Sequence, residues 1–270
     1  MDTETLKLRS VLVERYVTPL REGGSMPAIV EADDLGTYVL KFRGAGQGVR
    51  ALMAEIISGG IARALGLPVP EIVLAQLNGD LSRTESDPEI QDLIRASDGL
   101  NVALDYLPGA INFDPAVDVV DSDFASRLVW FDTLVSNVDR TARNTNMLMC
   151  KKQPWLIDHG ASLTFHHAWN GVVADPGKPF APSSEHVLLP LASQIAQVDA
   201  ELAEKLTPEV LRAIVDEVPD CFLVQAASER GGDSDVLSDV QAHRAAYVNY
   251  FVARLAERGR WVQGVIDARA

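Results

Sequence analysis

The stretch NVDRTARNTNMLMCKKQPWLIDHG, residues 137–160, decides how this chain folds. Two apolar runs, NMLMC and PWLID, are separated by the polar residues 151–153, a pattern that predicts a β-hairpin. The far ends of its strands then lie side by side and carry Asn144 and Asp158. Asp139 precedes the first strand by a loop that starts where a helix ends. We therefore expect these three oxygen-bearing side chains to converge on one point.

Converging oxygen ligands favour a particular chemistry. Carboxylate and carboxamide oxygens held in a cleft are what a magnesium ion with bound phosphates requires. A carboxylate set slightly apart can orient a hydroxyl group and take its proton. The stretch therefore indicates a site for phosphate chemistry.

The composition is that of a globular chain with an acidic surface. Its 270 residues are 47% hydrophobic and contain no apolar run long enough to span a bilayer. The formal net charge of −14 disfavours nucleic-acid binding, which needs a cationic face, so we predict no nucleic-acid and no membrane partner. Residues 1–7 resemble neither a signal nor a transit peptide, and a cytoplasmic location is expected. The two cysteines, Cys150 and Cys221, are expected to be buried thiols without a disulfide.

The first hundred residues read as strands with one helix between them. In TYVLKF, residues 37–42, Tyr, Leu and Phe alternate with other residues as in a strand, and Lys41 is the only charge. The segment 26–32 is expected to pair with it as a hairpin. From 49 to 65 apolar residues recur at helical spacing, and Gly66 stands where a C-terminal cap is expected. Further strands are predicted over residues 70–77 and 100–110.

The second half reads mostly as helices broken by loops that contain proline and glycine. Thr207 followed by Pro208 is a helix start signal. Residues 168–186 are expected to form a long irregular loop, and the composition shift near residues 103–110 is the expected boundary between two lobes. Helices are predicted over residues 121–138, 207–218 and 239–266.

The order of these features resembles a known family. Asp139, then Asn144 five residues later, then a strand pair ending in Asp158-His159-Gly160, resembles the catalytic loop and metal-binding triplet of kinase-like folds. The order Asp139-Arg140 is similar to HipA-type toxin kinases and phosphatidylinositol kinases. The segment TYVLKF resembles the strand that bears the phosphate-binding lysine, and MAEIISGGIARALGLPVPEIVL resembles the helix and strand that follow it in HipA-like proteins.

The resemblance implies a role for each residue of a catalytic set. Lys41 would hold the α- and β-phosphates of ATP, paired with Glu55 on the following helix. Asn144 and Asp158 would hold Mg²⁺, and Asp139 would orient the acceptor hydroxyl. The residues expected to touch ATP through the chain's backbone or a hydroxyl group are Gly23, Gly24, Ser25, Asp105, Tyr106 and Leu107.

The sequence departs from that of the relatives in two places. Ser25, Met26 and Pro27 stand where HipA-type kinases usually carry a glutamine and a lysine after the glycine of the nucleotide loop. His159 replaces the apolar residue that commonly follows the metal-binding aspartate in protein kinases. The catalytic set itself is complete, which argues against an inactive relative.

The resemblance thus implies an α+β, two-lobed, protein-kinase-like fold, with a small β-rich N-lobe (1–105) and a larger helical C-lobe (106–270). Its implied function is ATP- and Mg²⁺-dependent phosphoryl transfer of HipA-like type, with a Ser or Thr hydroxyl of a protein as the favoured acceptor. A small molecule or a lipid head group stays open as acceptor, and Ser25 and Thr18 are candidate autophosphorylation sites. The sequence does not indicate an oligomeric state.

Two other classes of function also stay open. His159, His166 and His167 with Asp158 could form the zinc site of a hydrolase, although their spacing fits no metal motif. A regulatory module could bind ATP without turning it over. Taken singly, a lysine in a strand or an asparagine in a loop is more often structural, so the prediction depends on the joint order of the residues.

Overall fold

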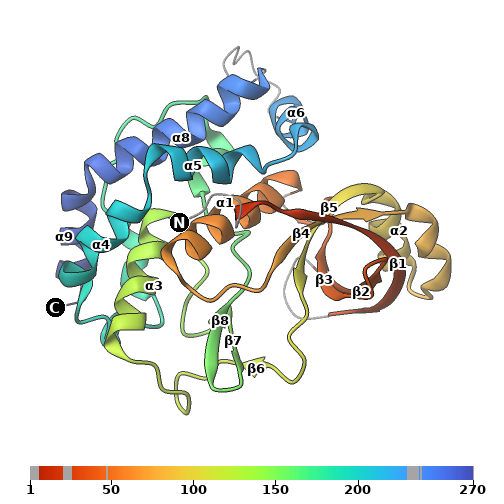
Figure 1. Cartoon of the computed structure of the whole chain (residues 1–270), viewed down its shortest axis with the longest axis horizontal. Coiled ribbons are helices and arrows are strands. Elements are labelled where there is room, and N and C mark those ends of the chain that lie inside the picture. The colour runs from red at the N-terminus through yellow and green to blue at the C-terminus, as the bar shows by residue number, and fades with distance from the viewer. Residues whose placement is uncertain (1–5, 21–25, 47, 230–236, 238, 270) are drawn as a thin grey trace.

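The structure is a computed structural model that describes residues 6–20, 26–46, 48–229, 237 and 239–269. Five strands of its N-terminal part form a closed barrel in the order β1-β2-β3-β5-β4. Neighbouring strands run antiparallel except β1 and β4, whose parallel pairing closes the barrel. Figure 1 shows the barrel at one end of the molecule and most helices at the other. The strands are β1 (Arg9–Pro19), β2 (Ala28–Ala32), β3 (Thr37–Lys41), β4 (Ile72–Leu77) and β5 (Gly99–Asp105).

The predicted hairpin of β2 and β3 is present. Ala28 lies opposite Leu40, and the Ala32 N–H donates to the Gly36 carbonyl at 3.0 Å to close the turn. Asp34 accepts a 2.9 Å hydrogen bond from the Gly36 N–H, as expected of a turn aspartate. Tyr38, Leu40 and Phe42 are all buried, which confirms that they share one face.

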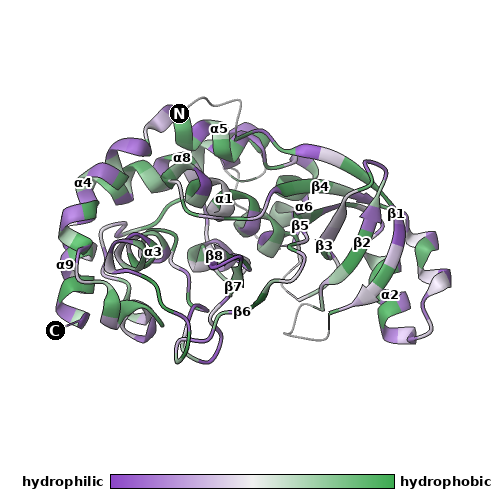
Figure 2. Ribbon diagram, turned by 60° about the horizontal axis from the view of Figure 1, so that its bottom comes forward, coloured by the Kyte–Doolittle hydropathy of each residue, from purple (hydrophilic) through white to green (hydrophobic). Residues whose placement is uncertain are grey.

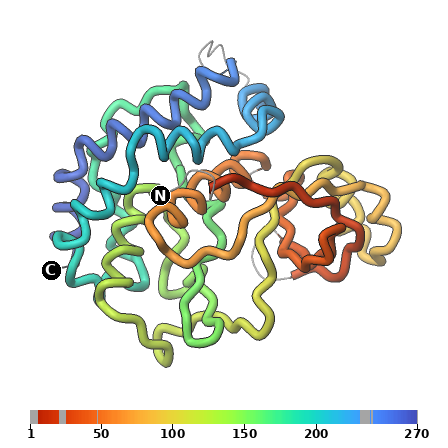
Figure 3. Tube along the Cα trace, viewed as in Figure 1, coloured from red at the N-terminus to blue at the C-terminus, as the bar shows by residue number. Residues whose placement is uncertain are grey.

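Helix α1 (Val49–Leu65) has the predicted bounds, and Gly66 ends it with a left-handed φ of 83°. Most of its residues are buried, Glu55 among them, so the helix is surrounded by the rest of the protein on several sides. The helix lies between the barrel and the helical part of the chain, where it packs against α5 (Pro208–Asp216) and α6 (Asp220–Ser228). Figure 3 shows this central place of α1 along the chain trace.

The expectation of one helix in the first hundred residues is wrong. A second helix, α2 (Pro88–Ala96), and the 3-10 helix η2 (Gly79–Thr84) lie outside the barrel. Asp87 caps α2 through the Glu89 N–H at 3.0 Å, and Pro88 occupies its first turn. Its buried side chains, Ile90 and Ile94, belong to the core cluster of the barrel.

The rest of the chain forms a helical lobe around a small sheet. The sheet has the order β6-β7-β8, and its hairpin of β7 and β8 pairs Met147 with Leu156 as predicted. Helices α3 and α5 confirm two of the predicted helices. The elements are α3 (Ser122–Leu134), α4 (Ile195–Lys205), α8 (Val240–Ala256), α9 (Arg258–Arg269), β6 (Ile111–Asn112), β7 (Met147–Cys150) and β8 (Gln153–Leu156).

Two helix boundaries differ from prediction by more than two residues, and long-range contacts accompany both differences. Helix α3 stops four residues early because the buried Arg254 donates to the carbonyls of Thr133 and Leu134 at 2.7 and 2.9 Å. The segment 239–266 is two helices that join at Glu257. The turn there lets Trp261 pack edge-on against Trp130, with ring centroids 5.2 Å apart.

The buried side chains form two clusters. The smaller one fills the barrel and the larger one joins α1 to the helical lobe. Figure 2 shows apolar and polar residues alternating along the outer helices α4 and α9. The residues that precede β1 also contact the helical lobe, because the Leu8 N–H donates to Glu217 at 2.8 Å.

The cysteines meet the prediction only in part. Both are free thiols, and Cys150 is buried in β7 as expected. Cys221 is exposed, because α6 buries Phe222, Leu223 and Ala226 and turns Cys221 outward. Within the described ranges, no helix combines the length and apolar content needed to cross a bilayer.

Candidate active site

Lys41, Glu55 and Asp158 meet where the barrel faces the helical lobe. Lys41 is the last residue of β3, Glu55 lies in the middle of α1, and Asp158 follows β8 by two residues. The Lys41 ammonium donates to Glu55 Oε2 at 2.7 Å and to Asp158 Oδ1 at 2.6 Å. The side chain of Asp158 is 41% exposed, that of Lys41 is 12% exposed and that of Glu55 is fully buried, so the cluster opens toward solvent mainly at Asp158.

The electrostatics keep Lys41 and Glu55 ionised. Burial opposes the charge of Glu55, but the Lys41 ammonium and a hydrogen bond from His159 lower its pKa to about 2. Burial likewise opposes the charge of Lys41, yet Glu55 and Asp158 raise its pKa above the usual value. Lys41 is therefore a fixed cation that faces an accessible carboxylate.

His159 holds Glu55 from the other side. Its backbone N–H donates to Glu55 Oε2 at 2.9 Å, and its ring Nδ1 lies 3.3 Å from Glu55 Oε1. The ring is fully buried and packs edge-on against Phe131, with centroids 5.8 Å apart. This role of His159 was not predicted. The one feature of the sequence that pointed to the site was its position directly after Asp158.

The loop that carries Asp139 forms a second cluster. Asn144 Nδ2 donates to Asp139 Oδ2 at 2.8 Å, and Asn146 Nδ2 lies 3.2 Å from the same oxygen. The Ile157 N–H donates to the Asn146 carbonyl at 3.1 Å, which ties the start of β7 to the residue before Asp158. The hairpin thus brings the end of the Asp139 loop next to Asp158.

A buried network, which we call the Asp132 network, supports the loop and consists of Asp132, Asn137, Arg140 and His186. Asp132 Oδ2 accepts from Arg140 Nε at 2.6 Å and lies 2.9 Å from His186 Nε2. Asn137 Nδ2 donates to the other carboxylate oxygen at 2.8 Å. Burial opposes ionisation of Asp132, but Arg140 and these hydrogen bonds lower its pKa to about 2.

The Asp132 network joins the loop to a distant segment. The Val187 N–H donates to the Arg140 carbonyl at 3.1 Å, and Thr141 forms an isolated β-bridge with His186. The stretch 168–186, expected to be irregular, includes the 3-10 helix η4 (Ala181–Glu185). This network was not predicted, although Asp132 is a lone charge inside the apolar run LVWFDTLV.

In the segment 105–107, which is expected to touch ATP, two backbone amides already make hydrogen bonds within the protein. The Asp105 N–H donates to the Glu71 carbonyl at 2.8 Å, and the Tyr106 N–H donates to the Thr37 carbonyl at 2.9 Å. Among the described residues no acceptor contacts the Leu107 N–H. Of these three amides, Leu107 is therefore the one available to a ligand. Burial and the nearby Glu71 carboxylate raise the pKa of Asp105.

The predicted nucleotide loop falls outside the described part of the chain. Gly23, Gly24 and Ser25 belong to the undescribed residues 21–25, so their role stays a prediction. The described ends of that connection meet, since the Leu20 N–H donates to the Pro27 carbonyl at 2.7 Å. Leu20 and Pro27 themselves lie next to the ends of β1 and β2, in the barrel that carries Lys41.

The structure gives no support to a zinc site. Within the described ranges no group of three or more histidine, cysteine, aspartate or glutamate side chains could hold a metal ion. His159 contacts Glu55, and His166 Nδ1 lies 3.1 Å from the Tyr247 hydroxyl in an aromatic cluster.

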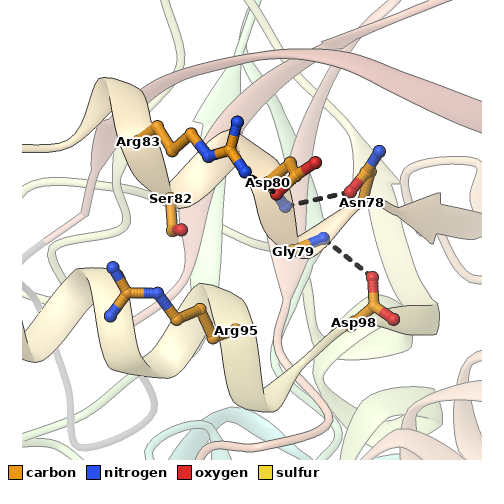
Figure 4. Close-up of a pocket in the computed structure, with 7 residues that line it drawn as sticks. All are labelled: Asn78, Gly79, Asp80, Ser82, Arg83, Arg95 and Asp98. Carbon is orange, nitrogen blue, oxygen red and sulfur yellow. Dashed lines mark hydrogen bonds and ion pairs between the residues drawn. The ribbon is translucent and has the colours of Figure 1, made fainter.

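A surface hollow lies away from these clusters. It has a volume of about 540 Å³ and lies beside η2 and α2 (Figure 4). Its Arg83 and Arg95 are each paired with an aspartate, Asp80 and Asp92. It contains none of the predicted site residues; its lining is Asn78, Gly79, Asp80, Ser82, Arg83, Arg95 and Asp98.

A β-rich lobe that carries a lysine-glutamate pair, set against a helical lobe that carries the Asp139 loop, is the architecture of a kinase-like fold, as the resemblance implied. A family model described as HipA-like kinase matches residues 13–247, and the chain belongs to that family. It is therefore a kinase by family, and the predicted recognition and fold class are confirmed.

Solved structures with similar chain traces include other kinases. The Helicobacter pylori proinflammatory kinase CtkA matches at 10% identity with a TM-score of 0.48, over 97% of this chain and 97% of that chain. A Golgi casein kinase with Mn and ADP bound matches at 11% identity with a TM-score of 0.44, over 94% of this chain and 74% of that chain. A search of curated protein sequences found no match.

Proposed function

We propose that this protein transfers the γ-phosphoryl group of ATP, with Mg²⁺, to a hydroxyl group. The observation that carries the proposal is the Lys41 ammonium, held by buried Glu55 at 2.7 Å and by accessible Asp158 at 2.6 Å. Phosphoryl transfer depends chiefly on fixed charges that position the phosphates. Membership of the HipA-like kinase family supports the same reaction.

The donor set fits magnesium. Asp158 uses only Oδ1 on Lys41, and the described residues provide no partner for its other oxygen. Asn144 is exposed and offers a carboxamide oxygen, so these two residues would hold the ion. When bound, Mg²⁺ neutralises charge on the phosphate oxygens.

The chain's own residues account for the remaining tasks. Lys41 would bind the α- and β-phosphates, and Glu55 keeps it aligned. Asp139 would accept a hydrogen bond from the acceptor hydroxyl and take its proton as the new P–O bond forms and the bond between the β-γ bridging oxygen and the γ-phosphorus breaks. Leu107 would offer its N–H to the adenine, and Gly23, Gly24 and Ser25 would contact the phosphates. We also propose that residues 1–105 act as the N-terminal lobe and residues 106–270 as the C-terminal lobe of the kinase.

A Ser or Thr hydroxyl of a protein is the acceptor we propose, because the chain is HipA-like. A small-molecule or lipid acceptor is the second possibility. The net charge of −14 works against docking on an anionic membrane and so favours the protein.

Purified protein incubated with Mg²⁺ and γ-labelled ATP tests the proposal. Label is expected on a protein, either the chain itself, as intact mass would show, or an added generic substrate. Asp139→Asn is the matched control, because it keeps the shape of the side chain and removes the base. ATP that is bound but never cleaved would instead identify a nucleotide-binding regulatory module.

A further inference from the structure

Asp139 receives two amide groups on one oxygen. Asn144 Nδ2 lies 2.8 Å and Asn146 Nδ2 lies 3.2 Å from Oδ2, and Asn146 Nδ2 is also 3.4 Å from the Asp139 backbone carbonyl. Among the described residues, none contacts the other oxygen, Oδ1. One oxygen is thus held by the protein, and the second is available to a substrate hydroxyl.

The two asparagines differ in how firmly they are placed. Asn144 is exposed, and its backbone contacts are to Thr141, at 2.9 Å and 3.4 Å. Asn146 is 8% exposed, and its carbonyl accepts hydrogen bonds from both Arg140 and the Ile157 N–H. Because Arg140 is fixed by the buried Asp132, Asn146 is anchored to the helical lobe from two sides.

The backbone of Asn146 also restricts which residue can stand there. Its φ is 46°, in the left-handed region that asparagine, aspartate and glycine tolerate better than other residues. Asparagine combines this tolerance with an amide donor of the length that reaches Asp139. The position therefore selects both a backbone conformation and a donor.

We propose that Asn146 is a positioning residue that holds Asp139 in its productive orientation, a role separate from that of Asn144. This inference rests on the proposed function. Asn144 is the predicted metal residue, and a side chain that serves a cation through its oxygen is not a fixed support for Asp139. The Asn146 side chain makes no hydrogen bond to Lys41, Asn144 or Asp158. Its contacts are to Asp139, and it would act through the Asp139 carboxylate.

Two substitutions separate this role from a packing role. Asn146→Gly keeps the left-handed backbone and removes the donor, and Asn146→Asp keeps the shape and places an acceptor against Asp139. Both should lower kcat about tenfold to a hundredfold, because a hydrogen bond to a charged group is lost. The KM for ATP and the nucleotide Kd should stay within about twofold, since Lys41 and Asp158 are untouched. Asn78→Asp, a surface cap outside the site that keeps its acceptor, controls for the added charge and should leave kcat unchanged.

A double-mutant cycle supplies a readout that a structural role would not give. In an Asp139→Asn background, Asn146→Asp should cost less than about twofold in residual kcat, because its target is gone. If Asn146→Asp lowers kcat equally in the unaltered protein and in Asp139→Asn, the inference is overturned. It is also overturned if Asn146→Gly and Asn146→Asp keep full kcat. Neither result would contradict the proposed function. No transfer by the unaltered protein overturns the proposed function, and this inference falls with it.

Discussion

Lys41 and Asp158 lie 117 residues apart in the sequence and form a 2.6 Å ion pair across the two lobes. The pair exists because β3 ends at Lys41 and β8 ends two residues before Asp158. With the buried Glu55 on the other side, the lysine has two carboxylate partners and little freedom. Charges fixed in advance are the main protein contribution to phosphoryl transfer.

Removing the lysine should affect both stability and activity. Lys41→Met leaves the fully buried Glu55 without its cation, and we expect a loss of about 3 kcal/mol in the free energy of unfolding together with loss of phosphoryl transfer. Denaturant unfolding measures the first effect and a kinase assay the second.

The double variant Lys41→Met/Glu55→Gln is the control for that experiment. It removes the orphaned charge, so most of the stability should return while transfer stays absent. Recovery of activity in the double variant would mean that Lys41 does not bind the phosphates.

His159 should matter through Glu55. His159→Phe keeps the backbone hydrogen bond and the edge contact with Phe131 but removes the ring nitrogen. We expect kcat/KM for ATP to fall about tenfold, the effect of one hydrogen bond to a charged group. His159→Asn, which retains a side-chain donor, should restore part of the activity, and equal losses in both variants would argue against this contact.

The Asp132 network should dominate stability around the Asp139 loop. Asp132→Asn leaves the guanidinium of Arg140, whose side chain is fully buried, without its counter-charge. We expect a loss of about 3–5 kcal/mol in the free energy of unfolding. His186→Gln keeps an amide donor for Asp132 and loses the ring nitrogen that accepts from the Leu188 N–H, so it should cost about 1 kcal/mol. A larger loss for His186→Gln than for Asp132→Asn would contradict this ranking.

The same carboxylates make stability depend on acid pH. Folding lowers the pKa of Glu55 from its usual 4.5 and that of Asp132 from its usual 3.8, each to about 2. A lowered pKa in the folded state adds stability that is fully present above the unfolded pKa and is lost as pH falls toward the folded one. We expect Tm to fall between about pH 5 and pH 2. The difference in the free energy of unfolding between the unaltered protein and Asp132→Asn should shrink over the same pH range. A constant difference would mean that Asp132 does not contribute to the acid dependence of stability.

Local patterns predict a large part of the fold. Alternating apolar residues identify β3, helical spacing with Gly66 identifies α1, and the runs around residues 151–153 identify the β7–β8 hairpin. Each signal lies within one segment, where side-chain period and end residues decide the structure. The Asp87-Pro88 start of α2 is a signal of the same kind, although α2 was not predicted.

The supporting contacts could not be predicted in the same way. Glu55 meets His159 across 104 residues, and Asp132 meets His186 across 54. No sequence period encodes such pairs, because tertiary packing brings them together. A charged residue inside an apolar run, such as Asp132, indicates a buried partner but does not say which residue it is.

The most direct test of the account is a single-turnover measurement of γ-phosphoryl transfer from ATP, with Mg²⁺, by the unaltered protein, Asp139→Asn and Asp158→Asn. We predict transfer by the unaltered protein and a loss of about a hundredfold to ten-thousandfold in Asp139→Asn at unchanged nucleotide affinity. In Asp158→Asn, transfer and Mg²⁺-dependent nucleotide binding should both be lost. Equal transfer by all three proteins would contradict the assignment of this site.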